Sequence, residues 1–411
     1  MNTSSKLFAC LAFAVTTVSA TAQGFEEPPT LDAATILRPE YAQGPYHKVR
    51  AAVPTYAGHN QYVIDSEFGT FEADGNTMLM QRVGEIYAIA KLRSISRTDQ
   101  YKEALKAAAR SPVTLAKNLA TQPVKTITGV PKGLWKMMNR VGQSAKEAGE
   151  NRERSQYEDS TAQDLIGFSK AKRDLAAELG IDPYSSNEVL QQELNGISWA
   201  AFGGKITLSA ALAPVGGAVM AGVNISDTAT KALRDVSPLD LRKQHLATLL
   251  ALHISREDAV AFLNNTAYSP THAFYLVEAL EHLDGVATLS RFIRLASEAS
   301  DEADALFFTR TAQVLARVHH DTPLAGLGSC GGFPMAIAKD GTIILALEWD
   351  YACWTERAAQ FVDAIKNGKY DGWTIAGYRV VLTGVASPMA KQALAALKVQ
   401  LVENALPGPL R

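Results

Sequence analysis

Two apolar runs joined by Asp340-Gly341 constrain the fold of this chain more than any other feature. In the segment 335–347, apolar and polar residues hardly alternate, and the only charged residues are Lys339 and Asp340. This pattern predicts two buried strands around a short turn. Asp-Gly favours a type I′ turn, in which both central residues have positive φ and the strands keep their natural twist. The sequence therefore predicts an antiparallel β-hairpin in the C-terminal part of the protein.

The residues that follow the hairpin predict further alternation of helices and strands. A helix is expected over 356–365, a strand over 374–382, a helix beginning at Ser387-Pro388, and a last strand over 399–402. The resulting order β-β-α-β-α-β is typical of a small α/β sandwich, in which helices cover a sheet. We expect this sandwich to occupy 321–411.

The rest of the chain predicts mainly helices. Residues 23–76 contain several prolines and little periodicity, which indicates an extended lead-in with a short β element. A helix should follow from Thr77, because apolar residues recur at helical spacing. Residues 236–320 predict five helices, two of them beginning at Ser237-Pro238 and Ser269-Pro270, where serine is the N-cap and proline the first helical residue.

The expected fold is therefore α+β, with a predominantly helical N-terminal and central region and a small C-terminal α/β sandwich. The helical part is expected to be an antiparallel bundle. The predicted divisions are a leader over 1–22, the lead-in over 23–76, a basic helical region over 77–195, a bundle with a Gly/Ala-rich apolar hairpin over 196–320, and the sandwich over 321–411.

The N-terminus has the features of a secretory signal peptide. Lys6 supplies a positive charge, residues 7–18 are mostly apolar, and Ala20-Thr21-Ala22 is a small-x-small cleavage site. An ordinary buried helix is the alternative interpretation. We expect an exported protein, periplasmic or secreted, that is cleaved after Ala22.

Cysteine usage leads to a further expectation. Removal of the leader would take away Cys10 and leave Cys330 and Cys353, and two thiols in an oxidising compartment are a candidate disulfide. The register of the predicted hairpin would bring both near its open end. The sequence therefore predicts a structural disulfide between Cys330 and Cys353.

Positive charge gathers in one region of a chain that is nearly neutral as a whole, with 40 Lys+Arg against 42 Asp+Glu. Residues 91–154 hold 14 basic residues and five acidic ones. Lys132, Lys136 and Arg140 lie four residues apart beside Trp135, which predicts a basic amphipathic helix. Such a helix could lie on an anionic membrane, or it could be a soluble helix whose apolar face packs on the core.

A second unusual region is the uncharged run of 21 residues over 206–226. Ala213, Gly217 and Ala221 are spaced four apart, which permits close contact between helices. Pro214 and two glycines would turn or kink a helix here. A buried helical hairpin, a hairpin inserted in a membrane, and a single membrane span remain open as interpretations.

The sequence lacks three common catalytic or phosphate-binding motifs. Neither a Gly-x-x-x-x-Gly-Lys-Ser/Thr loop, a Gly-x-Ser-x-Gly elbow nor a His-Glu-x-x-His helix is present. Glu348 and Asp350 are weak candidates for acid/base catalysis, because carboxylates among aromatic residues can have raised pKa values. The alternative is a strand end that closes the domain core. We expect no metal, cofactor or nucleic-acid ligand.

These observations lead to two functional hypotheses. The first is an exported, non-catalytic interaction protein that associates with an anionic lipid surface or an envelope protein through Lys132, Trp135, Lys136, Arg140, Ala213, Gly217 and Ala221. The alternative is a periplasmic or secreted hydrolase that acts on an envelope polymer through Glu348 and Asp350. The sequence gives no indication of the oligomeric state.

Overall fold

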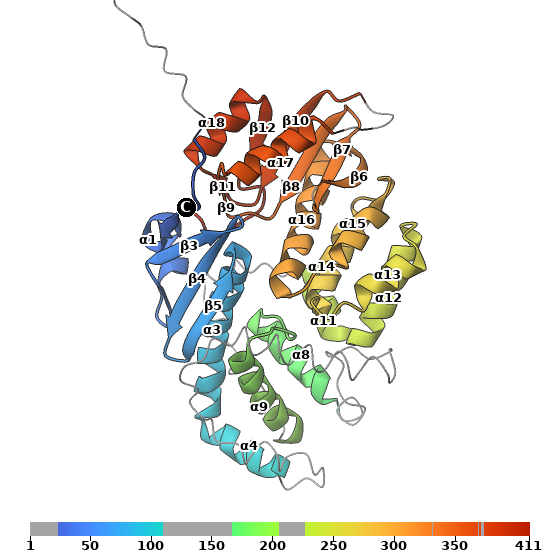
Figure 1. Ribbon diagram of the computed structural model, residues 1–411. Helices are drawn as coiled ribbons and strands as arrows, with labels where there is room; N and C mark the ends of the chain where they lie inside the picture. The colour runs from blue at the N-terminus through green and yellow to red at the C-terminus, as the bar shows by residue number, and fades with distance from the viewer. Residues whose placement is uncertain (1–23, 110–166, 205–226, 331, 369, 371–373) are drawn as a thin grey trace, which may run out of the picture.

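A computed structural model describes residues 24–109, 167–204, 227–330, 332–368, 370 and 374–411 (Figure 1). Within these residues, sheets of five, five and two strands alternate with helices along the chain. The expectation of a mainly helical protein with a small C-terminal α/β domain is therefore wrong, because strands are spread over both ends of a mixed α+β fold.

The N-terminal part forms an antiparallel five-stranded sheet where only a lead-in with a short β element was expected. Its central strand β4 pairs with β3, β2 and β5, and β1 pairs with β3. Short strands, and Pro54 within one of them, obscured the alternation of buried and exposed residues in the sequence. The elements of this part are β1 (Thr30–Asp32), α1 (Ala33–Ile36), α2 (Pro39–Ala42), β2 (Lys48–Val49), β3 (Ala52–Tyr56), β4 (His59–Ser66) and β5 (Gly69–Asp74).

The helix predicted from Thr77 is confirmed as α3 (Asn76–Ser96). Leu79, Val83 and Ile86 are buried in a core shared with the N-terminal sheet. α3 runs from this sheet to a helical lobe formed by α4 (Asp99–Ala109), α8 (Phe168–Leu179) and α9 (Glu188–Gly204) (Figure 1). α4 and α8 both pack against α9.

The five helices expected over 236–320 are confirmed, and α11 (Asp227–Asp235) precedes them. Ser237 and Ser269 cap helices whose first residue is proline, as predicted, since each serine side chain accepts a backbone N–H from the first turn. The five helices are α12 (Pro238–Ala251), α13 (Arg256–Leu263), α14 (Pro270–Glu281), α15 (Leu289–Ala296) and α16 (Glu302–Asp321).

The C-terminal sheet contains the predicted hairpin, and its strands lie in the order β12-β10-β8-β7-β6. β8, β10 and β12 are parallel, whereas β6, β7 and β8 are antiparallel. The short strands β9 and β11 form the separate pair. The elements are β6 (Leu324–Cys330), β7 (Phe333–Ala338), β8 (Thr342–Leu347), β9 (Tyr351–Ala352), α17 (Glu356–Lys366), β10 (Gly377–Leu382), β11 (Val385–Ala386), α18 (Pro388–Ala396) and β12 (Val399–Val402).

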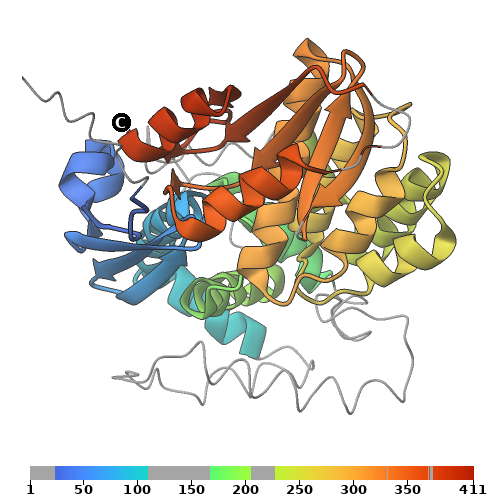
Figure 2. The same cartoon turned by 45° about the horizontal axis from the view of Figure 1, so that its top comes forward.

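The C-terminal sheet is covered on both faces, and this joins it to the helical bundle. Ala336 and Ile344 pack into the core of α14, α15 and α16, whereas Ile337 and Ile343 pack with α17 and α18. Strands buried on both faces read as continuous apolar runs, which explains the pattern of 335–347. Figure 2 shows α17 on one face of the sheet and the bundle helices on the other.

The predicted disulfide is not formed, because Cys330 and Cys353 are both free thiols in the structure. The register argument assumed that residues before Met335 continue the hairpin strand. Instead the chain reverses at Gly332, which has a positive φ of 84°. Cys330 therefore ends an unforeseen strand, β6, and pairs with Phe333 at the start of β7. Cys353 follows β9, which pairs with β11 away from β6.

Candidate functional site

The carboxylates of Glu348 and Asp350 lie together after β8, at the contact between the C-terminal sheet and the N-terminal sheet. Their exposed fractions are only 2% and 1%. The neighbouring Trp349 packs its ring on Gly58, where a Cβ atom would lie 2.7 Å from the ring. The chain therefore brings the two predicted acids into a buried junction.

Asp350 uses both carboxylate oxygens to hold backbone groups of the N-terminal part. Its Oδ2 accepts the N–H of Asn60 at 2.9 Å, and both oxygens lie 3.1 Å from the N–H of Asn76, the first residue of α3. Burial and the charge of Glu348 raise the pKa of Asp350 to about 7, against the lowering effects of His59 and these backbone N–H groups.

Glu348 completes the junction by contacting α3 and β4. Its Oε1 accepts a hydrogen bond from Thr77 Oγ1 at 2.9 Å, and its Oε2 lies 3.6 Å from Nδ1 of His59. Burial lowers the pKa of His59, but the charges of Glu348, Asp350 and Asp74 outweigh burial, so the pKa is raised overall. We call Glu348, Asp350, His59, Asn60, Asn76 and Thr77 the polar junction.

The geometry of the polar junction favours a structural role for the two acids. Both oxygens of Asp350 are engaged by the backbone, and Glu348 contacts Thr77 and His59. A carboxylate acting as acid or base must reach a proton of the substrate. Acid/base catalysis by Glu348 and Asp350 stays a prediction, and these contacts do not favour it.

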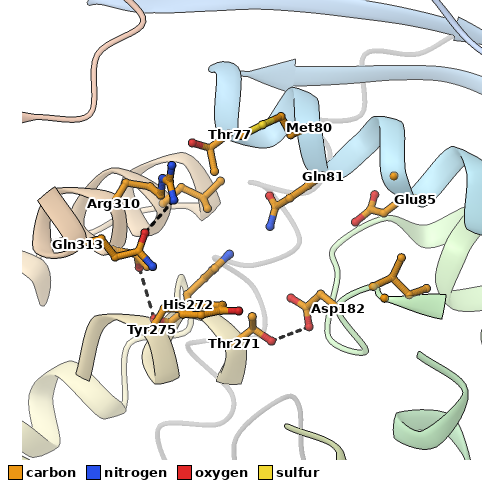
Figure 3. Close-up of a pocket in the computed structure, with 15 residues that line it drawn as sticks. Thr77, Met80, Gln81, Glu85, Asp182, Thr271, His272, Tyr275, Arg310 and Gln313 are labelled. Carbon is orange, nitrogen blue, oxygen red and sulfur yellow. Dashed lines mark hydrogen bonds between the residues drawn. The ribbon is translucent and has the colours of Figure 1, made fainter. Parts of the chain in front are cut away.

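A different site lies next to the junction, where α3, α14, α16 and residues 180–182 surround a cavity of about 120 Å³ (Figure 3). Met80, Ile181 and Leu306 form apolar walls. Polar side chains enter from each element: Thr77, Gln81 and Glu85 from α3, Asp182 from the loop before α9, Thr271, His272 and Tyr275 from α14, and Thr309, Arg310 and Gln313 from α16.

His272 supplies a fixed hydrogen-bond donor to this cavity. The side chain is 4% exposed, and its Nδ1 lies 3.5 Å from the N–H of Ser269 in a capping box at the start of α14. Because Nδ1 accepts, the proton of the neutral ring resides on Nε2. Burial lowers the pKa of His272, and Nε2 has no hydrogen-bond partner in the structure.

Two further cavity groups have unsatisfied polar atoms. The Oε1 of Gln81 and the Nε of Arg310 are buried and have no hydrogen-bond partner. Arg310 donates from its other nitrogens to Gln313 Oε1 at 2.8 Å and to the carbonyl of Pro407 at 3.4 Å. A buried polar group without a partner costs about 1–3 kcal/mol, so three such atoms around one cavity require an explanation.

The opposite wall of the cavity carries acids. Asp182 accepts a hydrogen bond from Thr271 Oγ1 at 2.6 Å and another from the N–H of Tyr184 at 2.8 Å. Burial raises its pKa to about 6 despite these bonds. Glu85 is satisfied by the protein itself, since it binds Arg82 at 3.0 Å and also accepts from Ser185 and Asn187.

The cavity and the polar junction share one residue. Thr77 lines the cavity and also donates to Glu348. Glu348 is near enough to Arg310 for its charge to oppose the effect of burial, which lowers the pKa of Arg310. The predicted acids therefore lie next to the cavity without lining it.

Sequence reasoning missed the cavity because its residues come from four separate segments and follow no motif. Ser269-Pro270 was recognised as a helix start, and the third helical position of such a start is where a capping box places its second side chain. That position is His272. This signal identifies a positioned histidine, but only the tertiary structure shows that its Nε2 lies beside Gln81 and Arg310.

The other predicted contact residues lie outside the described part of the chain. These residues are Lys132, Trp135, Lys136, Arg140, Ala213, Gly217 and Ala221. The predicted leader 1–22 also lies outside the described part. Among the helices that the structure describes, none is long and apolar enough to cross a membrane. The described residues also contain no group of three or more His, Cys, Asp or Glu arranged to hold a metal ion.

Comparison with known proteins gives no assignment. No protein-family model matches the chain, no curated protein is detectably similar to it, and no solved structure matches it.

Proposed function

We propose that this protein binds a small polar molecule in the cavity between α3, α14 and α16. The observation that carries the proposal is the set of buried, unpartnered polar atoms around it: His272 Nε2, Gln81 Oε1 and Arg310 Nε. A ligand that supplies both an acceptor and a donor would satisfy these atoms. Binding pockets typically combine apolar walls with a few such positioned polar groups.

The size of the cavity limits the ligand. A cavity of about 150 Å³ in another protein accommodates benzene, which has six non-hydrogen atoms. A cavity of about 120 Å³ therefore suits a molecule of roughly that size or smaller. Its walls come from both the N-terminal and the C-terminal parts of the chain, so a bound molecule would link the two.

The test is a thermal-shift screen of the purified protein with small polar compounds, followed by calorimetric titration of those that stabilise it. Binding to the folded state raises the melting temperature by mass action. His272→Phe should abolish the shift by filling the cavity and removing a donor. His245→Phe is the matched control, because His245 is also buried and has a lowered pKa of about 4 but does not line the cavity. Equal shifts in both variants would contradict the proposal.

A second function, association with an anionic lipid surface or an envelope partner, is proposed from the sequence and supported by one observation. The start of α8, which follows the basic segment, lies against the last turns of α9, which precedes the Gly/Ala-rich run. Phe168, near the start of α8, stacks on Trp199 of α9 with ring centroids 4.3 Å apart, and α4 packs along α9. Phe202 in the last turn of α9 is 38% exposed.

Liposome co-sedimentation tests this second proposal. A protein that binds anionic lipid through its basic segment should bind anionic vesicles and release them at high salt, because salt screens charge interactions. Replacing Lys132, Lys136 and Arg140 by Gln should weaken binding to anionic vesicles. Equal binding to neutral and anionic vesicles at low and high salt would contradict it.

A further inference from the structure

The two charged groups of the cavity that lack an ion-pair partner have opposite signs. Figure 3 shows Arg310 on α16 at one side and Asp182 on the facing loop at the other, with His272 and Gln81 between them. Among the described residues, no carboxylate lies within ion-pair distance of Arg310, whose partners are the neutral Gln313 and Pro407. Asp182 likewise accepts only from the neutral Thr271 and the Tyr184 backbone.

The rest of the buried charge in this region is paired within the protein. Arg82, which directly follows Gln81 on α3, contacts Glu85 at 3.0 Å and Glu302 at 3.1 Å. A buried charge is ordinarily stabilised by an opposite charge, since burial removes its hydration. Arg310 and Asp182 depart from this rule on opposite walls of one cavity.

The arrangement matches a molecule that carries both charges. A carboxylate beside Arg310 would accept from the guanidinium and from His272 Nε2–H, in charge-assisted hydrogen bonds. An ammonium group would find the carboxylate of Asp182 on the facing wall, and the amide of Gln81 can present its carbonyl between the two. A cavity of about 120 Å³ leaves room for only a short chain between the charges.

We infer that the ligand is a short zwitterionic amino acid, with its carboxylate held by Arg310 and His272 and its ammonium held by Asp182. This inference rests on the proposed small-molecule function and names the ligand class for that site. A neutral polar molecule would leave both charges without a counterion. An anion alone would leave Asp182 unpaired, and a cation alone would leave Arg310 unpaired.

The test is calorimetric titration of the full chain at pH 7.5 with glycine, L-alanine, propionate, ethylamine and propionamide. Glycine or L-alanine should bind at least tenfold more tightly than propionate or ethylamine, because each of these lacks one charge. Asp182→Asn should reduce amino-acid affinity to the level of propionate, because the ammonium group loses its counterion. Arg310→Gln should reduce it to the level of ethylamine, because the carboxylate loses its counterion.

Asp182→Asn is suited to this test because the asparagine carbonyl can still accept from Thr271, and circular dichroism would check that both variants fold. A proton-release experiment adds an independent readout. Because an ammonium group would lower the raised pKa of Asp182, binding at pH 6 should release protons, seen as a dependence of the measured heat on the buffer's ionisation enthalpy.

The outcomes separate the two proposals. Propionamide binding as tightly as L-alanine would overturn the zwitterion and leave small-molecule binding intact. Propionate binding as tightly as L-alanine would also overturn it, in favour of a simple anion. If no compound of this set or of the wider polar screen binds, both proposals fail.

Discussion

The polar junction and the cavity are two buried polar clusters that share Thr77, yet they differ in how their hydrogen bonds are satisfied. In the junction, Asp350 and Glu348 direct their oxygens at backbone and side-chain partners within the chain. In the cavity, atoms of Gln81, His272 and Arg310 have no partner at all. The unpartnered atoms of the cavity are themselves buried, so burial of polar atoms alone does not distinguish the two clusters.

The difference teaches how a structural polar cluster can be told from a binding site. A buried network that satisfies itself fixes the relative position of the elements it joins. A cluster whose donors and acceptors face a cavity bears an energetic cost in the protein alone, which a ligand can offset. Glu348 and Asp350 were the candidates from sequence, and the comparison moves attention to their neighbours on α14 and α16.

The largest expected effect comes from breaking the polar junction. Asp350→Ala would leave the N–H groups of Asn60 and Asn76 buried without an acceptor, and the expected loss is about 3 kcal/mol in the free energy of unfolding. Urea titration followed by circular dichroism measures this. Asp65→Ala is the control, because Asp65 forms an exposed pair with Arg50, and pairs of this kind contribute little. A loss no larger than the control's would show that the junction does not join the two sheets.

The next effect is a dependence of stability on pH. Both Asp350, with a pKa of about 7, and His59 have pKa values raised above their ordinary values in the folded protein. A raised pKa means that the folded state binds protons more readily than the unfolded state, so these contributions are present at low pH and are lost as pH rises through the folded pKa. The contribution of these two groups to the free energy of unfolding should therefore fall between pH 5 and pH 8, by up to about 1.4 kcal/mol per pH unit for each group, whereas buried His245 and His272, with lowered pKa values, act in the opposite direction.

Chemical denaturation at a series of pH values tests this expectation. In Asp350→Asn, the part of this pH dependence of stability that comes from the Asp350 carboxyl group should disappear. The part that comes from His59 should remain. If Asp350→Asn shows the same pH dependence as wild type, the junction does not bind protons in the manner described.

Local patterns predicted many individual elements but not how they assemble. The Asp340-Gly341 hairpin, α3 and the capped helices α12 and α14 follow from turn residues, periodicity and N-caps that lie close together in sequence. The N-terminal sheet was missed because β2 has two residues and β3 five, too few for a clear alternation. β6 was missed because its glycines read as a loop.

The candidate sites show the same limit. The sequence could identify Glu348 and Asp350 as acids among aromatics, but Asn60 and Asn76, whose backbone N–H groups bind Asp350, come from about 280 residues earlier in the chain. Whether Arg310 has a counterion depends on contacts between α16 and segments distant in sequence. The predicted disulfide was wrong for a related reason, since one unforeseen strand reversal placed Cys330 on β6.

The smallest effect is the sharpest test of the comparison, because it predicts that removing a polar group costs nothing. Gln81→Met keeps the length of the side chain and removes the unpartnered Oε1, so the free energy of unfolding should stay the same or rise by about 0.5 kcal/mol. Gln191→Met is the matched control: Gln191 donates to the carbonyls of Pro183 and Ser185 at 3.1 and 3.0 Å, so its loss should cost about 1 kcal/mol. Urea titration of the two variants gives the comparison directly. If Gln81→Met is destabilised as much as Gln191→Met, then the Gln81 side chain already has hydrogen-bond partners within the protein. The cavity would then be a structural cluster like the polar junction.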